Sequence, residues 1–314
     1  MWFKNLQLFN LEQNWTLPPG GLEERLAQRA LTPCPALSLQ SCGWVPPAES
    51  PALVQSLDRH LLIALGVEQR LLPAAVINDA AKEKAIEWEK QRGFKPGRKL
   101  LREFKDRATA ELLPRAFVRR RSTRAWIDPQ SRRIIVDSSA PARGEQVVEQ
   151  LRDALGELSL TLPQPSDSPA ATMTAWLASG SAPGQFALGE DCELTGGEDN
   201  KAVVRYVRHP LQPVQVRKHL DEGFRVTRLA LTWSGRIGLV VNEKLQIKRV
   251  NFLDIDENAK AETKLTPEEK FEADFALMTG EYTMLLNDLL DAFGVDVPTK
   301  RAAAARAHGE HAAV

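Results

Sequence analysis

RAFVRRRSTRAWIDPQSRRIIV, residues 115–136, indicates two strands joined by a turn. The residues up to Trp126 are predicted to be extended, and Asp128-Pro129-Gln130-Ser131 is a typical turn sequence. The second strand is predicted from Arg132 to Val136, and the segment from Gly144 to Leu155 has the apolar spacing of a helix. A strand pair followed by an amphipathic helix predicts the α+β class.

A second segment loosely resembles the first. Thr227 to Trp233 is a predicted strand that also ends in tryptophan, Ser234-Gly235 predicts a turn, and Arg236 to Val241 predicts the returning strand. A helix is predicted later, from Ala273 to Phe293. Two interpretations stay open: an internal duplication, or a coincidence, because a strand pair plus a helix is common in α+β proteins.

The other predicted elements include a pair of charged helices. Strands are expected at Trp2 to Phe9 and at Arg59 to Leu65, with a short helix at Leu22 to Leu31. Helices are expected at Ala74 to Gln91 and Lys99 to Leu113, and Phe94-Lys95-Pro96-Gly97 separates them. Their apolar stripe is thin, so we expect a projecting helical hairpin and not a core element.

The length of 314 residues indicates more than one domain, because single cores stop growing near about 250–300 residues. The Pro/Ser-rich segment from Pro163 to Pro169 marks a boundary. We therefore expect an elongated, multi-domain α+β subunit with antiparallel sheets and amphipathic helices. Its predicted parts are a central α/β domain (1–73 and 114–162), the basic hairpin as a tip (74–113), a second α+β domain as a base (163–296) and a flexible tail (297–314).

Charge is sorted into alternating blocks although the net charge is zero. Residues 90–133 hold 15 Lys/Arg against 4 Asp/Glu, and residues 201–249 hold 11 against 3. The stretches 134–200 and 250–296 are each net −9. Two basic surfaces on a neutral chain point to a polyanion as the partner.

Signals for export, membrane insertion and disulfides are missing from the sequence. No stretch approaches the roughly 18 consecutive apolar residues of a membrane span, and the start of the chain lacks the features of a signal peptide. Cys34, Cys42 and Cys192 are odd in number and have no metal-ligand spacing. We therefore expect a cytoplasmic protein with reduced cysteines and no membrane partner.

Catalytic and cofactor motifs are also missing. The sequence has no GxxxxGK[ST], GxGxxG, HExxH or GxSxG motif. Asp254, Asp256 and Glu257 could bind Mg²⁺ in a nuclease, although a solvated acidic loop is the simpler interpretation. We expect no enzymatic activity, no metal and no cofactor, and keep the nuclease as an alternative.

The basic residues instead predict binding to nucleic acid. In an extended chain Arg115, Phe117, Arg119 and Arg121 share one face, and guanidinium groups suit phosphate oxygens. Phe117 could stack on a base or wedge against one, or could equally anchor the strand in the core. No base-reading module is present, so binding should be weakly sequence-dependent; the alternative is an ordinary solvated surface. The candidate DNA-binding residues are Lys95, Arg98, Arg115, Phe117, Arg119, Arg121, Arg205, Arg208, His209 and Lys218.

Motifs along nearly the whole chain resemble those of the RdgC family of bacterial recombination-associated, nucleoid-associated DNA-binding proteins. Only the last 18 or so residues fall outside the resemblance. The matching motifs are Met1-Trp2-Phe3-Lys4-Asn5-Leu6, Gly43-Trp44-Val45-Pro46-Pro47, Leu112-Leu113-Pro114-Arg115-Ala116-Phe117, Trp126-Ile127-Asp128, Thr174-Ala175-Trp176 with Ser179-Gly180-Ser181-Ala182, and Asp274-Phe275-Ala276-Leu277-Met278-Thr279-Gly280-Glu281.

The resemblance implies a ring-shaped homodimer that encircles double-stranded DNA, with weaker binding to single strands, and that limits access of the RecA recombinase. It also implies that Phe117 and the stretch from Arg205 to His209 face the DNA. Here Arg208 and His209 stand where relatives tend to carry Lys and Gln, so this contact could depend on pH through His209. A module that inhibits recombinase by direct contact, without DNA, is a further alternative.

Overall fold

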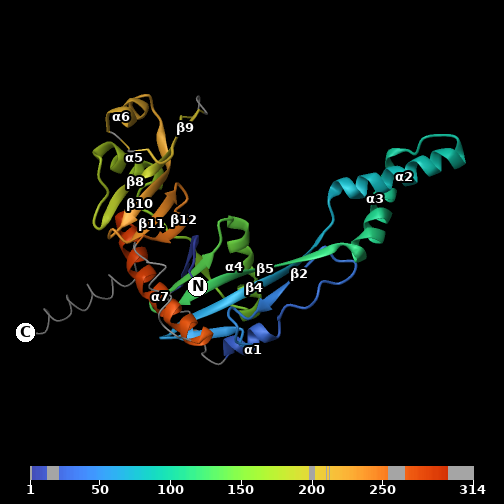
Figure 1. The fold of residues 1–314 in the computed structure, drawn as a ribbon, viewed down its shortest axis with the longest axis horizontal. Helices are drawn as coiled ribbons and strands as arrows, with labels where there is room; N and C mark the ends of the chain where they lie inside the picture. Colours follow the sequence, from blue (N-terminus) through green and yellow to red (C-terminus); the bar gives the residue numbers. More distant parts are fainter. Residues whose placement is uncertain are drawn as a thin grey trace, which may run out of the picture.

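The computed structural model describes residues 2–12, 21–197, 202–209, 211, 213–253 and 266–295. One antiparallel sheet of twelve strands connects most of this part of the chain (Figure 1). Its main path runs β2-β4-β5-β6-β1-β12-β11-β10-β8-β9, while β3 pairs with β4 and β7 with β1. The predicted α+β class with antiparallel strands is thereby confirmed.

The bounds of the elements follow. The strands are β1 (Leu6–Leu11), β2 (Gln40–Val45), β3 (Val54–Leu57), β4 (His60–Leu71), β5 (Phe117–Asp128), β6 (Arg133–Asp137), β7 (Leu160–Thr161), β8 (Phe186–Thr195), β9 (Val203–Tyr206), β10 (Arg225–Trp233), β11 (Ile237–Asn242) and β12 (Ile247–Phe252). The helices are α1 (Gly21–Ala27), α2 (Ala74–Arg92), α3 (Arg98–Leu112), the short 3-10 helix η1 (Leu113–Arg115), α4 (Pro141–Leu155), α5 (Pro169–Ser179), α6 (Pro213–Asp221) and α7 (Pro267–Ala292).

The turn between β5 and β6 forms where the sequence predicts it. Asp128 Oδ1 accepts hydrogen bonds from the backbone N–H groups of Gln130 and Ser131, which holds the turn locally. The extended chain before it begins only at Phe117, because η1 includes Pro114 and is helical. The expectation that Arg115 continues the strand alternation is therefore wrong.

The two faces of the sheet carry separate apolar cores. Alternation in β5 sends Trp126 into the core beneath α5, α6 and α7, and Ile127 into the core beneath α1 and α4. Below, the "α7 face" is the first of these two faces and the "α4 face" is the second. No described residue of β8 to β12 belongs to the core of the α4 face, so helices cover only one half of that face.

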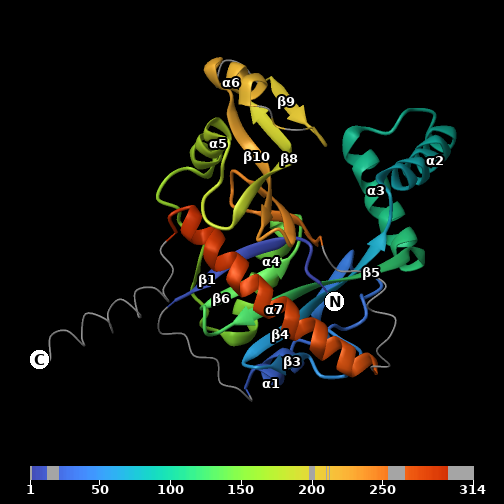
Figure 2. The ribbon, with the colours of Figure 1, turned by 60° about the vertical axis from the view of Figure 1, so that its left-hand side comes forward.

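Helix α7 starts six residues earlier than the sequence pattern predicts. Thr266 and Glu269 form a capping box, and Pro267 occupies the first turn, so the helix begins ahead of its apolar residues. Figure 2 shows α7 lying along the sheet, and its inward residues are fully buried, among them Phe275, Tyr282 and Leu289.

Helices α2 and α3 lie against each other away from the sheet (Figure 1). Trp88 and Phe104 pack edge-on, and Lys84 and Glu111 form an ion pair at 2.8 Å. Few of their residues are buried, Ala81 in α2 and Phe104 and Ala108 in α3, in agreement with the thin apolar stripe.

The two similar segments of the sequence differ in the structure. The β5–β6 pair is followed by α4 on one face, whereas β10 and β11 are followed by a third strand, β12, and then by α7 on the other face. The β1–β12 pairing makes the sheet continuous across the predicted boundary between central and second domains, and that division stays a prediction. The predicted tail lies outside the described residues. No described helix has the length and apolarity to cross a bilayer.

Candidate nucleic-acid interface

Strand β5 presents Phe117, Arg119 and Arg121 on the α4 face. They share the alternation of Ala125 and Ile127, which are buried beneath α4. Arg120 points to the opposite face. The predicted row of side chains therefore exists on this strand, but without Arg115, which lies exposed in η1.

Arg121 is crowded by other cations. Partial burial lowers its pKa, and the guanidinium groups of Arg143 and Arg119 lower it further. Arg143 comes from the first turn of α4, in a stretch of the sequence that is acidic overall. Only the packing of α4 against the sheet brings it here. Two neighbouring guanidinium groups of like charge around Arg121 favour the binding of an anion here.

Phe117 is 85% exposed at the end of the β4–β5 pair, where it lies opposite Leu71. The interpretation of Phe117 as a core anchor is therefore wrong. An exposed aromatic ring next to Arg119 is an arrangement suited to a nucleotide base or another apolar partner.

A second group of arginines lies on the same face at the other end of the sheet. Glu193 in β8 is directly opposite both Arg205 in β9 and Arg228 in β10. Its Oε2 atom lies 2.8 Å from Arg205 Nε and 3.7 Å from Arg228 Nη1. Arg205 and Arg228, which both belong to the second basic block, therefore contact the same carboxylate.

Asp191 extends this second group. It lies 3.3 Å from Arg249 Nη1 and accepts a hydrogen bond from the backbone N–H of Arg208. Arg205, Arg228 and Arg249 line a cavity of about 280 Å³ together with Asp191 and Glu193. Carboxylates of the acidic block before residue 201 thus partly neutralise the second basic block, a mixing that charge counting along the chain does not reveal.

The remaining predicted residues lie elsewhere. Lys95 and Arg98 are exposed at the connection between α2 and α3, away from the sheet (Figure 1). Lys218 is exposed on α6, a helix that packs on the α7 face through Val216. Because α6 packs on the α7 face, Lys218 does not join the arginines of the α4 face.

His209 lies beside Tyr206, with ring centroids 5.9 Å apart, and its backbone N–H donates to Glu190 O.

The two arginine groups are separated within one chain. β5 and β9 stand on opposite sides of β1 in the strand order. Figures 1 and 2 both show α2 and α3 at one extremity of the molecule and β9 with α6 at another. One subunit therefore presents two distinct basic surfaces and not a single patch.

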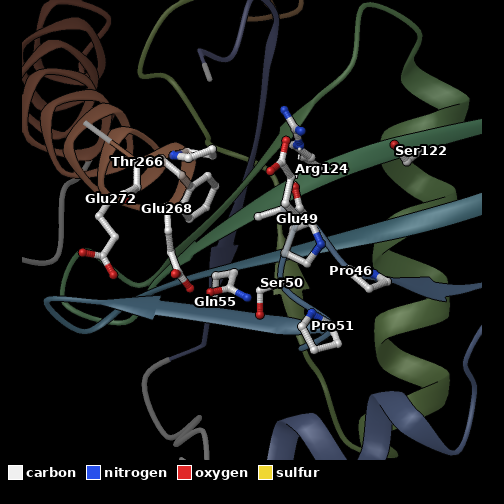
Figure 3. A pocket seen from close by; sticks show the side chains of 14 residues that line it. Pro46, Glu49, Ser50, Pro51, Gln55, Ser122, Arg124, Thr266, Glu268 and Glu272 are labelled. Carbon is white, nitrogen blue, oxygen red and sulfur yellow. Dashed lines mark hydrogen bonds between the residues drawn. The ribbon is translucent and has the colours of Figure 1, made fainter. Parts of the chain in front are cut away.

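A larger cavity, of about 720 Å³, lies at the start of α7 and has the wrong charge for nucleic acid. Figure 3 shows Glu268 and Glu272 extending from α7, with Glu49 and Arg124 on the facing wall. Arg124 Nε donates to Pro47 O, and burial lowers the pKa of this guanidinium. Carboxylates around one tethered arginine repel phosphate, so this cavity is not part of the candidate interface.

Asp254, Asp256 and Glu257, the possible metal ligands of a nuclease, lie outside the described residues. Within the described part of the chain, no group of three or more His, Cys, Asp or Glu side chains could hold a metal ion.

Comparisons with known proteins agree over most of the chain. Residues 1–296 match the family model described as "Putative exonuclease, RdgC". The recombination-associated protein RdgC of Dechloromonas aromatica (strain RCB) is 45% identical over 300 residues, which cover 95% of this chain and 99% of that protein. The proteins of the same name from Janthinobacterium sp. (strain Marseille) and Herminiimonas arsenicoxydans are each 44% identical; the aligned regions cover 96% and 94% of this chain and 100% and 98% of theirs.

Proposed function

The chain belongs to the RdgC family of recombination-associated proteins, and from this premise we propose that it binds double-stranded DNA without sequence preference. The observation that carries the proposal is the α4 face, where Arg143 and Arg119 both act on Arg121 and the exposed ring of Phe117 lies further along the same strand. The guanidinium groups suit phosphate oxygens, which carry no sequence information, so we expect binding without sequence preference.

We further propose that two subunits form a ring around the duplex. Each chain has two separate arginine groups on the same face of its sheet, so a two-fold assembly would surround DNA with four such groups. Lys95 and Arg98 near the tip of the α2–α3 pair extend the basic surface of each subunit. Duplex DNA has the higher charge density, so single strands should bind more weakly.

A ring on DNA would act as a passive barrier and not as a catalyst. Encirclement keeps the protein on the duplex without tight contacts, because release requires an interface to open. Occupied DNA would then be less accessible to the RecA recombinase, which fits the recombination-associated names of the relatives. We accordingly propose a cytoplasmic, nucleoid-associated protein that acts as a homodimer without a cofactor.

A comparison of linear and covalently closed duplexes of the same sequence tests encirclement. After binding, a high-salt wash should remove the protein from the linear duplex, from which a ring can slide off, and leave it on the closed circle. Equal loss from both would show surface binding without a closed ring.

A salt titration tests the phosphate contacts separately. The logarithm of the binding constant should fall with the logarithm of salt concentration by about 0.9 per phosphate contacted. A slope near zero would contradict the proposal and leave direct recombinase inhibition as the better account. Cleavage of end-labelled duplex in Mg²⁺ or Mn²⁺ would instead favour the nuclease alternative, which the family description mentions.

A further inference from the structure

One carboxylate oxygen of the second arginine group contacts two guanidinium groups. Glu193 Oε2 accepts from Arg205 Nε at 2.8 Å and lies 3.7 Å from Arg228 Nη1. We propose that Glu193 is a positioning residue that occupies the place of a phosphate oxygen between these arginines and limits the affinity of the protein for DNA. The inference rests on the proposed DNA-binding function and adds a regulatory element to it.

The strand register fixes this arrangement. Glu193 is paired across β8–β9 with Arg205 and across β8–β10 with Arg228, so both arginines lie beside it on the α4 face. The Glu193 side chain is 19% exposed, whereas that of Arg205 is 67% exposed. The carboxylate is thus held in the sheet, and the Arg205 guanidinium remains accessible to solvent.

A DNA phosphate that approaches this cavity meets arginines that already have a counter-ion. To contact Arg205 and Arg228 together it must displace the Glu193 carboxylate, which then stays close to the phosphate and repels it. Asp191 has the same relation to Arg249 in the same cavity. Binding is therefore weaker than three arginines alone would give.

The test is the affinity of a Glu193→Gln variant for a linear duplex over a series of salt concentrations. We expect the dissociation constant to fall about fivefold, the effect of removing one unit charge about 4 Å from a phosphate in water. The salt slope should steepen by up to about 0.9, because one further phosphate is neutralised. Glu193→Asp keeps the charge and should bind like the wild type. Asp191→Asn provides a second variant, whose affinity for the duplex should also rise.

Glu281→Gln is the matched control. Glu281 is 13% exposed and pairs with Arg236 at 3.0 Å, but it belongs to α7, on the other face of the sheet. The same removal of charge there should leave DNA affinity unchanged. A gain equal to that of Glu193→Gln would attribute the effect to net charge and overturn the inference.

The inference and the proposed function fail in different ways. If the wild type shows no salt-dependent DNA binding, the proposed function itself fails. If the wild type binds with a steep salt slope and Glu193→Gln binds equally or more weakly, the DNA-binding function stands and Glu193 does not restrain it.

Discussion

Glu68 Oε1 accepts a hydrogen bond from Arg120 Nε at 2.5 Å, and the two residues lie directly opposite each other in β4 and β5. The second oxygen of Glu68 accepts the backbone N–H of Cys34 at 2.9 Å. Arg120 is thereby committed to the α7 face, although its neighbours Arg119 and Arg121 lie on the α4 face. The run of three arginines is divided between a structural and a candidate binding role.

We predict that the ionised Glu68 carboxylate stabilises the folded protein at neutral pH and that this stabilisation is lost in acid. The N–H of Cys34, followed by Arg120, holds the pKa of the Glu68 carboxyl below its ordinary value of 4.5. Because the folded-state pKa is the lower one, this stabilisation is present above pH 4.5 and is lost as the pH falls through the folded-state value.

Denaturant unfolding of wild type and Glu68→Gln between pH 3 and pH 7 measures this effect (roughly the range over which carboxylates titrate). The variant should be less stable at neutral pH, and the difference should shrink toward the acid end. A difference independent of pH would show that the ionised carboxylate is not what stabilises this contact.

Some features of the fold and of the candidate interface can be predicted from the sequence, and others cannot. The β5–β6 turn is readable because Asp128 bonds to backbone within three residues, and the length of α7 could have been read from Thr266 and Glu269. Arg143 could not be placed, because its position beside Arg121 depends on how α4 packs on the sheet. Pairing across β8 likewise brings Glu193 into a block that counts as basic along the chain.

Charge reversal on the α4 face should weaken DNA binding without unfolding the protein. In the double variant Arg119→Glu and Arg121→Glu, Arg121, which lies near Arg143, and its neighbour Arg119 are replaced by carboxylates. We expect at least about a tenfold decrease in duplex affinity near 0.1 M salt, and a salt slope smaller by about 0.9 for each phosphate that the variant no longer neutralises.

Arg59→Glu with Lys270→Glu is the control for this variant. Both residues are exposed, one in the β3–β4 turn and one near the start of α7, and the change in net charge is identical. An equal decrease in affinity in both double variants would mean that net charge, and not the α4 face, governs binding.

The N-terminal segment is held to α7 by a buried hydrogen bond. Tyr282 Oη donates to Phe3 O at 2.6 Å, and both residues are almost fully buried. Burial raises the pKa of Tyr282, so the hydroxyl stays protonated and keeps donating throughout the neutral range. Tyr282→Phe should lower the free energy of unfolding by about 1–2 kcal/mol, because it leaves a buried carbonyl without its donor.

Urea titration compares this variant with Tyr206→Phe. Tyr206 is half-buried on β9, and removal of its hydroxyl should change stability by less than about 0.5 kcal/mol. Equal effects in the two variants would show that the Tyr282 bond contributes nothing specific to the attachment of the N-terminal segment.

Substitution of Phe117 should affect DNA binding while leaving the stability of the fold almost unchanged. Its ring is 85% exposed and belongs to neither apolar core, so Phe117→Ala should change the free energy of unfolding by less than about 0.5 kcal/mol. If the ring contacts DNA, the same change should weaken duplex binding about fivefold or more, the lower end of the range for removal of an aromatic ring that stacks on a base.

Sedimentation of the variant without DNA completes the Phe117 experiment, because an exposed ring beside Leu71 could serve a second subunit instead of DNA. Weaker DNA binding by a dimer of unchanged stability would assign the ring to nucleic acid. Dissociation of the proposed dimer together with failure to retain DNA would assign the ring to a subunit interface, and the contribution of the α4 face to binding would then rest on its arginines alone.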